Sequence, residues 1–298
     1  MVEQSVRREP RRSGGRGCLD RSFSVPSISQ ARRERQVSVS QPPTQNRDVW
    51  AGLKAFTPAR IGIKSVGGAV PTRTLLELQL DHARAREAVY RELDLESLEE
   101  EIRRVLPVVR VHSAAPDRAT YIRLPNLGRQ LDTESQERLT RLRSAVRWDL
   151  TFIIADGLSG AAVMDYAFST LLACLPRLAA WKLSPIVLAQ QARVALGDPI
   201  CEVLNSRVSV VLIGERPGLS VCNSLGAYVT WEPRPGRTDA ERNCVSNIHS
   251  GGLACEDAAR AICCILEEAS RRGCSGTAIK NETTAPPSSS ASLGAGTR

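Results

Sequence analysis

The sequence predicts an α/β protein with a Rossmann-like, mostly parallel sheet that carries helices on both faces. Short aliphatic and β-branched runs recur after residue 107 and alternate with longer segments of helical periodicity. The most apolar run, from Val208 to Ile213, is bounded by turn residues and is typical of a strand buried on both faces. A small helical N-terminal domain is expected before the sheet, and a disordered basic tail before that domain.

The chain of 298 residues divides into four predicted parts. Residues 1–47 are rich in Arg, Ser, Gln and Pro but poor in aliphatic side chains, so we expect a disordered basic extension, although an Arg- and Ser-rich start is also typical of an organelle transit peptide. Residues 48–106 are predicted to form the helical N-terminal domain, and residues 107–280 the Rossmann-like domain. Residues 281–298 are rich in Ser, Thr, Ala and Pro and are expected to be a disordered tail.

The net charge of +8 does not indicate a nucleic-acid-binding fold, because ten arginines and four acidic residues in residues 1–47 account for +6 of it. Nine cysteines without a C-x-x-C pair are typical of reduced thiols in a cytosolic protein. No apolar stretch reaches membrane-spanning length, and residues 1–30 lack the apolar core of a secretory signal. We therefore expect a cytoplasmic protein with neither nucleic acid nor membrane as a partner.

Helical periodicity marks the N-terminal domain. Pro71 stands where a helix can start, and an aliphatic stripe continues to about Arg91. A second helix is predicted from about Leu95 to Leu106, with acidic residues at its start and arginines at its end, as the helix dipole favours. The pattern then changes, and short strands are predicted at 108–111 and 121–124.

Strands and helices alternate in the rest of the chain. The further strands are predicted at 150–155, 185–189, 208–213 and 227–231. The helices are predicted at 133 to about 146, 159 to about 175, 198–205 and 256–272. Asp132 or Thr133 caps the first of these helices, Asp198-Pro199 begins the third, and Gly273 ends the last.

Three loops that follow strands carry side chains suited to ligand binding: residues 156–159, 214–219 and 241–252. Ligands of open α/β sheets bind beyond the carboxyl ends of the strands, and helix starts offer free N–H groups. Each loop also has a purely structural interpretation. The first would be a helix cap, the second a tight turn with solvated Glu215 and Arg216, and the third a set of Asn and Ser turns.

Taken together, these loops resemble the small subunit of adenosylcobalamin-dependent ethanolamine ammonia-lyase. The matching stretches are TPARIG, PTRTLLELQLDHARAR, IIADGLS, VLIGERPGL and ERNCVSNIHSGG, in an order and spacing that fit across roughly residues 55–280. The first 47 residues show no such resemblance. They lack the apolar amphipathic helix with which family members often enter a protein-shelled bacterial microcompartment, so that destination stays open.

The resemblance implies a heterodimer repeated in a larger oligomer. A separate large subunit, a TIM barrel, would hold ethanolamine and perform the radical chemistry that yields acetaldehyde and ammonia. The small subunit would help to bind adenosylcobalamin at the interface. By similarity, its cofactor contacts fall on Val194, Glu215 and Cys244, with Arg193 as a neighbouring candidate. The cobalt is carried by the corrinoid, which keeps its own benzimidazole on the metal, so no metal ligand and no catalytic residue is expected here.

A competing interpretation is a stand-alone Rossmann-like enzyme in which Cys244 is a nucleophile and His249 its base. Two residues in one loop are weak evidence for this chemistry without a third group that orients them. We prefer packing of the small Cys244 side chain against the cofactor. The glycine-rich motifs G-x-G-x-x-G and G-x-x-x-x-G-K-[ST] are absent, which argues against a dinucleotide or nucleoside triphosphate site.

Overall fold

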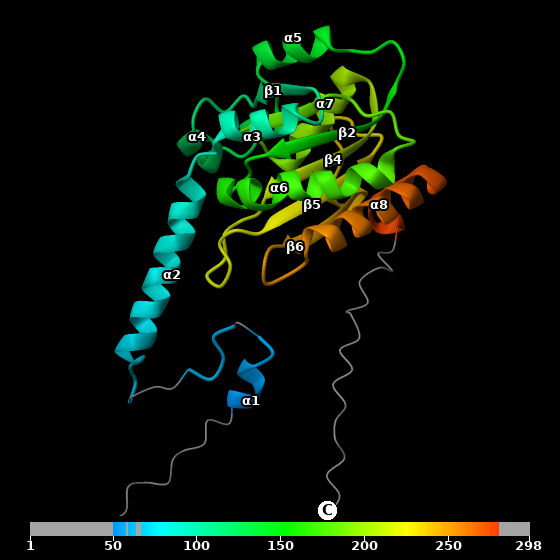
Figure 1. Ribbon diagram of the computed structural model, residues 1–298. Helices are drawn as coiled ribbons and strands as arrows, with labels where there is room; N and C mark the ends of the chain where they lie inside the picture. The colour runs from blue at the N-terminus through cyan, green and yellow to red at the C-terminus, as the bar shows by residue number, and fades with distance from the viewer. Residues whose placement is uncertain (1–49, 58, 64–66, 280–298) are drawn as a thin grey trace, which may run out of the picture. The chain divides into compact units, whose positions relative to one another are not determined.

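The computed structural model describes residues 50–57, 59–63 and 67–279, so the predicted extensions at 1–47 and 281–298 lie outside the described residues. A six-stranded sheet of order β1-β3-β2-β4-β5-β6 forms the centre of the fold (Figure 1). Its strands are β1 (Val108–His112), β2 (Trp148–Ala155), β3 (Ile186–Gln190), β4 (Ser206–Gly214), β5 (Leu225–Trp231) and β6 (Arg242–Ile248).

The α/β class is confirmed, but the sheet is mixed rather than a purely parallel Rossmann sheet. Strands β1, β3, β2 and β4 pair in parallel, whereas β5 is antiparallel to both β4 and β6. The reason is the length of the connections. Residues 215–224 and 232–241 are too few for the helical crossover that a parallel neighbour requires. Strand β6 lies within residues 241–252, which we predicted as a loop because their sequence is polar.

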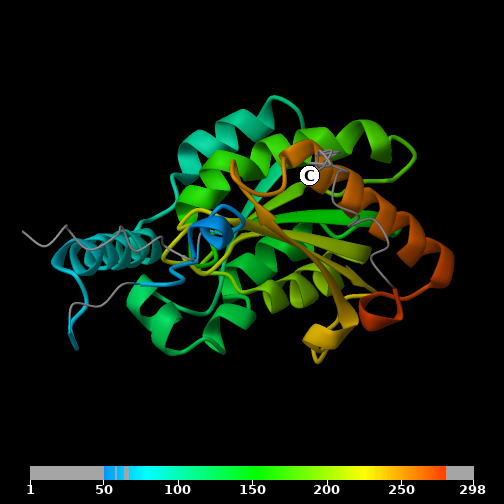
Figure 2. The same cartoon turned by 90° about the horizontal axis from the view of Figure 1, so that it is seen from below.

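Helices cover both faces of the sheet, as predicted (Figures 1 and 2). Helices α3 (Leu95–Arg103), α6 (Gly160–Cys174) and α8 (Cys255–Arg272) pack on one face, and α5 (Thr133–Arg141) and α7 (Gly197–Leu204) pack on the other. Strand β2 serves both layers, because Phe152 and Ile154 point into the first core and Ile153 and Ala155 into the second.

The predicted strand at 121–124 is wrong, because these residues belong to α4 (Arg118–Arg123) and the turn that follows it. Asp117 starts this helix by accepting a hydrogen bond from the Thr120 backbone N–H at 2.8 Å. The Asp198 cap is also wrong, since α7 begins at Gly197 and the Asp198 carboxylate pairs with Arg242 instead. The Asp132 cap and the left-handed Gly273 at the end of α8 are confirmed.

The N-terminal helices are α1 (Ala51–Lys54) and α2 (Thr72–Tyr90), followed by α3, which ends three residues before the predicted end. Leu95, Leu98 and Ile102 of α3 belong to the same apolar cluster as the sheet. The division between residues 48–106 and 107–280 stays a prediction. Five 3-10 turns complete the described elements: Leu127–Arg129, Leu175–Leu178, Val194–Leu196, Asp239–Glu241 and Gly276–Ala278. None of the described helices has the length and apolar character needed to cross a membrane.

Candidate functional site

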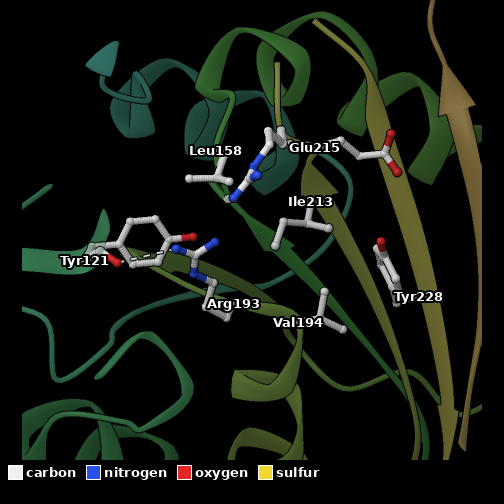
Figure 3. A pocket seen from close by; sticks show the side chains of 10 residues that line it. Tyr121, Leu158, Arg193, Val194, Ile213, Glu215 and Tyr228 are labelled. Atoms are coloured by element: carbon white, nitrogen blue, oxygen red, sulfur yellow. Dashed lines mark hydrogen bonds between the residues drawn. The ribbon is translucent and has the colours of Figure 1, made fainter. Parts of the chain in front are cut away.

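A pocket of about 370 Å³ opens where β2, β3 and β4 end. This edge of the sheet is where ligands bind in open α/β folds. Figure 3 shows Tyr121 and Arg193 on one side of the pocket and Glu215 and Tyr228 on the other. The apolar side chains between them are those of Leu158, Val194 and Ile213. The pocket is therefore apolar in its middle, with Arg193 at one end and Glu215 at the other, and the exposed Arg216 also lines it.

Asp156, the first residue after β2, holds the loop that follows β3. Its buried carboxylate accepts hydrogen bonds from the backbone N–H groups of Gln191 and Ala192, each at 3.0 Å, and from Arg118 Nη1 at 3.2 Å. Burial raises the pKa of Asp156, and these three donors oppose that shift. Asp156 was predicted in a ligand loop, but its oxygens are occupied within the protein, so it positions the residues that follow Ala192.

The loops after β2 and β4 pack against each other through two glycines. Gly157 has a φ of +55°, and a Cβ on it would lie 2.2 Å from the Gly214 carbonyl oxygen. That same oxygen accepts a hydrogen bond from the Leu158 N–H at 2.9 Å. Ser159 caps α6, because its hydroxyl accepts from the Ala162 N–H at 3.4 Å. The structural interpretation of the first predicted loop therefore holds, and the close contact places Leu158 at the pocket.

Glu215 presents one side of its carboxylate to the pocket. Ser224 Oγ donates to Glu215 Oε2 at 3.1 Å, and the Glu215 N–H donates to the Ser224 carbonyl at 2.9 Å. The side chain lies over Gly226, where an added Cβ would be 2.6 Å from Oε1. Among the described residues, Glu215 and Arg216 form no ion pair within 4.0 Å, with each other or with another residue.

Val194 and Arg193 enter the pocket from the loop that Asp156 holds. Val194 begins the 3-10 turn Val194–Leu196 and packs partly against the core under α7. The Arg193 guanidinium lies 4.3 Å from the centre of the Tyr121 ring. Tyr121 is fully buried, and its hydroxyl donates to the Ala192 carbonyl at 2.9 Å. Tyr121 is not among the predicted site residues, because residues 121–124 were predicted as a strand, although Pro116-Asp117 is a signal for a helix start.

Cys244 lies beside the pocket rather than in it. On the antiparallel pair of β5 and β6 it stands opposite Tyr228, which lines the pocket, so both side chains are on one face. The helices that contact β5 and β6 are α6 and α8, and they pack on the other face. A continuous surface thus leads from Val194 and Glu215 over Tyr228 to Cys244.

The geometry does not support Cys244 as a nucleophile. Cys244 is exposed as a residue, but desolvation of its thiol is the main cause that raises its pKa. The charge of Glu215 also raises this pKa, and the hydrogen bond with Tyr228 lowers it. A higher pKa keeps the thiol protonated, whereas a nucleophilic cysteine requires the thiolate. The proposed base, His249, accepts a hydrogen bond at Nδ1 from the Gly251 N–H at 3.1 Å. The two side chains therefore interact with other groups.

The fold and this pocket define an α/β protein with a candidate ligand site at the carboxyl ends of its parallel strands. A comparison with protein families then identifies the group. The model of the ethanolamine ammonia-lyase light chain matches residues 47–280, and the chain belongs to this family. The family predicted from the loop motifs is thereby confirmed.

Individual relatives agree with this assignment. The chain is 49% identical over 245 residues to a protein of Bradyrhizobium diazoefficiens, an alignment that covers 81% of this chain and 94% of the relative. It is 46% identical over 255 residues to a protein of Xanthomonas campestris pv. campestris, with 83% and 93% covered. A protein of Pseudomonas paraeruginosa is 43% identical over 246 residues, with 81% and 90% covered. Each relative is named ethanolamine ammonia-lyase small subunit.

Proposed function

We propose that this chain helps to bind adenosylcobalamin as the small subunit of an ethanolamine ammonia-lyase, which converts ethanolamine to acetaldehyde and ammonia. Its partner is a separate large subunit, a TIM barrel that holds ethanolamine, and the two form heterodimers within a larger oligomer. The observation that carries this proposal is that Val194 and Glu215, both named by the family resemblance, line one pocket with Cys244 adjacent to it.

The side chains of the pocket fit a corrinoid. A corrin ring has a broad apolar face and peripheral amides that both donate and accept hydrogen bonds. Leu158, Val194 and Ile213 supply apolar contact. Glu215 supplies a carboxylate acceptor, of which only Oε2 has a hydrogen bond among the described residues. The buried Arg193 Nε has no hydrogen-bond partner there, so the pocket also holds an unused donor.

This chain contributes binding and orientation rather than proton transfer. When bound, adenosylcobalamin supplies radical chemistry through its cobalt–carbon bond. Glu215 accepts a hydrogen bond from a peripheral amide, Val194 packs on the apolar face, and the small side chain of Cys244 allows close approach. The tyrosine hydroxyls at the pocket are poor proton donors, because burial is the main cause that raises the pKa of both Tyr121 and Tyr228.

A cofactor titration of the reconstituted two-subunit complex tests this proposal. A hydrogen bond to a charged acceptor contributes about 1.5–3 kcal/mol, so Glu215→Ala is expected to raise the dissociation constant for adenosylcobalamin roughly ten- to a hundredfold. Glu215→Gln keeps one acceptor oxygen and loses less. The visible spectrum of bound cobalamin reports binding, and size-exclusion chromatography reports assembly.

The control is Glu267→Ala, which removes an exposed carboxylate on α8, on the other face of the sheet. It is expected to bind the cofactor as the wild type does. Equal affinities of wild type, Glu215→Ala and Glu215→Gln would show that Glu215 serves only the turn it closes with Ser224.

A further inference from the structure

Arg193 differs from every other arginine that is at least half-buried in the described residues. Nine arginines there are buried or half-buried, and eight of them have a carboxylate oxygen within 4.0 Å. The eight paired arginines are Arg60, Arg110, Arg118, Arg138, Arg147, Arg207, Arg237 and Arg242. Arg193 is the ninth and has no such partner in the described part of the chain.

The hydrogen bonds of Arg193 leave most of its donors unused. Its Nη2 donates to the Tyr121 carbonyl at 3.4 Å, and its Nε is buried without a partner. The guanidinium lies beside the Tyr121 ring, on the side of the pocket opposite Glu215 (Figure 3). The aromatic ring stabilises the cation but accepts no in-plane hydrogen bond from it. Arg118, 5.0 Å from the same ring, differs because it is paired with Asp156.

The backbone holds Arg193 at this position. Its N–H donates to the Gly128 carbonyl at 2.8 Å, and the two preceding residues are bound to Asp156. Taking a cation out of water is unfavourable unless an anion and hydrogen-bond acceptors replace the water. Since no described carboxylate lies within 4.0 Å of Arg193, a ligand of the pocket can provide the anion.

We propose that Arg193 binds the phosphodiester of the corrinoid, an inference that rests on the proposed function. The nucleotide loop of cobalamin contains one phosphodiester, and the other peripheral groups of the molecule are neutral amides and hydroxyls. A guanidinium offers a planar fork of N–H donors that matches two phosphate oxygens. The carboxylate of Glu215 at the other end of the pocket disfavours an anion there. Arg216 also lines the pocket without an ion pair, but it is exposed to water, whereas Arg193 is half-buried, so we assign the phosphate to Arg193 and amide donors to Glu215.

Two ligands that differ only in the phosphate test this assignment: adenosylcobinamide and adenosylcobinamide phosphate. Both are titrated against the reconstituted two-subunit complex, and binding is followed by visible absorbance. In the wild type, the phosphate form is expected to bind about ten- to a hundredfold more tightly, the range of a hydrogen-bonded charge pair. In Arg193→Met this ratio is expected to fall to about one to two, while Arg193→Lys retains part of it because it keeps the charge.

The matched control is Arg129→Met, which removes an exposed arginine from the turn Leu127–Arg129, outside the pocket. Its ratio is expected to equal that of the wild type. An unchanged ratio in Arg193→Met, or a wild-type ratio near one, would overturn the phosphate assignment. An equal loss of affinity for both ligands in Arg193→Met would also overturn it. That result is expected if Arg193 pairs with a carboxylate of the large subunit. A wild-type complex that does not bind adenosylcobalamin itself would instead overturn the proposed function.

Discussion

At the scale of single residues, the pocket depends on a carboxylate that does not face the ligand. Asp156 connects three parts of the chain, because it accepts from Arg118 after β1 and from Gln191 and Ala192 after β3. Gln191 adopts a φ of +50°, a conformation that a non-glycine residue adopts only when its surroundings hold it there. The two backbone hydrogen bonds to Asp156 supply that restraint, and Arg193 and Val194 follow directly.

Asp156→Asn is therefore expected to destabilise the chain and to weaken cofactor binding together. The asparagine side chain keeps one acceptor oxygen, but its NH₂ group would face one of the backbone N–H donors of Gln191 and Ala192. The buried Arg118 would also lose its anionic partner. Breaking a buried ion pair in this way costs about 3–5 kcal/mol. Urea unfolding measures the loss.

The exposed Asp165, which accepts a hydrogen bond from Asn223 Nδ2 at 2.8 Å, provides the control. Asp165→Asn is expected to change the free energy of unfolding by no more than about 0.5 kcal/mol. If Asp156→Asn were as stable as Asp165→Asn, groups other than the Asp156 carboxylate would have to hold the positive φ of Gln191.

At the scale of elements, the pocket exists because the loops after β2 and β4 approach each other without side chains between them. A Cβ on Gly157 would lie 2.2 Å from the Gly214 carbonyl oxygen, and a Cβ on Gly214 would lie 2.1 Å from the Ser159 carbonyl oxygen. Leu158 and Glu215, the residues that directly follow these two glycines, line the pocket as a result.

Two glycine substitutions distinguish the cost of backbone strain from the cost of steric overlap between an added Cβ and its neighbours. Gly273, with a φ of +68°, has no atom within 4 Å of an added Cβ, so Gly273→Ala is expected to cost only the strain of about 1–2 kcal/mol. Gly157→Ala adds overlap with Gly214 and is expected to cost about 2–5 kcal/mol in total. Urea unfolding measures both, and cofactor binding should fall only in Gly157→Ala. Equal costs for the two variants would contradict the close contact of the loops.

The turn between β5 and β6 contains a carboxylate that should make stability depend on pH. Glu241 accepts hydrogen bonds from the Thr238 N–H at 2.8 Å and the Thr238 hydroxyl at 3.0 Å, and it pairs with Arg237. The Thr238 backbone bond is the largest cause that lowers the pKa of Glu241 from 4.5 to about 2. Because the folded pKa is the lower one, this stabilisation is present above pH 4.5 and is lost as the pH falls towards 2.

Glu241→Gln is accordingly expected to be less stable than the wild type at pH 6, and this difference should shrink progressively below pH 4.5. Urea unfolding at a series of pH values measures the difference. Glu267→Gln, at an exposed position on α8, should match the wild type throughout. A difference between Glu241→Gln and wild type that stays constant with pH would show that the ionised carboxylate is not what stabilises the turn.

At the scale of the whole molecule, the pocket continues onto a face of the sheet on which neither α6 nor α8 packs. The face of β5 and β6 that carries Tyr228 and Cys244 is not the face on which α6 and α8 pack. Only part of it is covered, by the buried Arg242 that pairs with Asp198 of α7 and hydrogen-bonds Thr230 at 3.0 Å. The proposed function places the large subunit on this face.

The isolated chain is therefore expected to release no acetaldehyde from ethanolamine and adenosylcobalamin. The residues that line its pocket include no histidine, and its tyrosines and the neighbouring Cys244 have raised pKa values. In the proposed function Glu215 binds the cofactor, and ethanolamine binds to the large subunit. A coupled assay for acetaldehyde measures the reaction, and addition of the large subunit should restore it. Turnover by the purified chain alone would contradict the division of labour between the subunits.

Local signals in the sequence were sufficient for the α/β class, for most strands and helices, and for the family. Asp132 and Gly273 show why, since a helix cap and a left-handed stop depend on residues within one turn of the helix end. Val194 and Glu215, which the family resemblance names as candidate cofactor contacts, line one pocket, and their role stays a prediction. Tertiary structure decided the direction of β5, the existence of the polar strand β6 and the helical state of Tyr121. Tertiary structure also decides which arginines are paired. Arg118 pairs with Asp156, which is 38 positions away in the sequence, whereas Arg193 has no carboxylate partner among the described residues. Pairing, burial and the presence of a counter-ion depend on residues that are distant in sequence, and no local pattern records them.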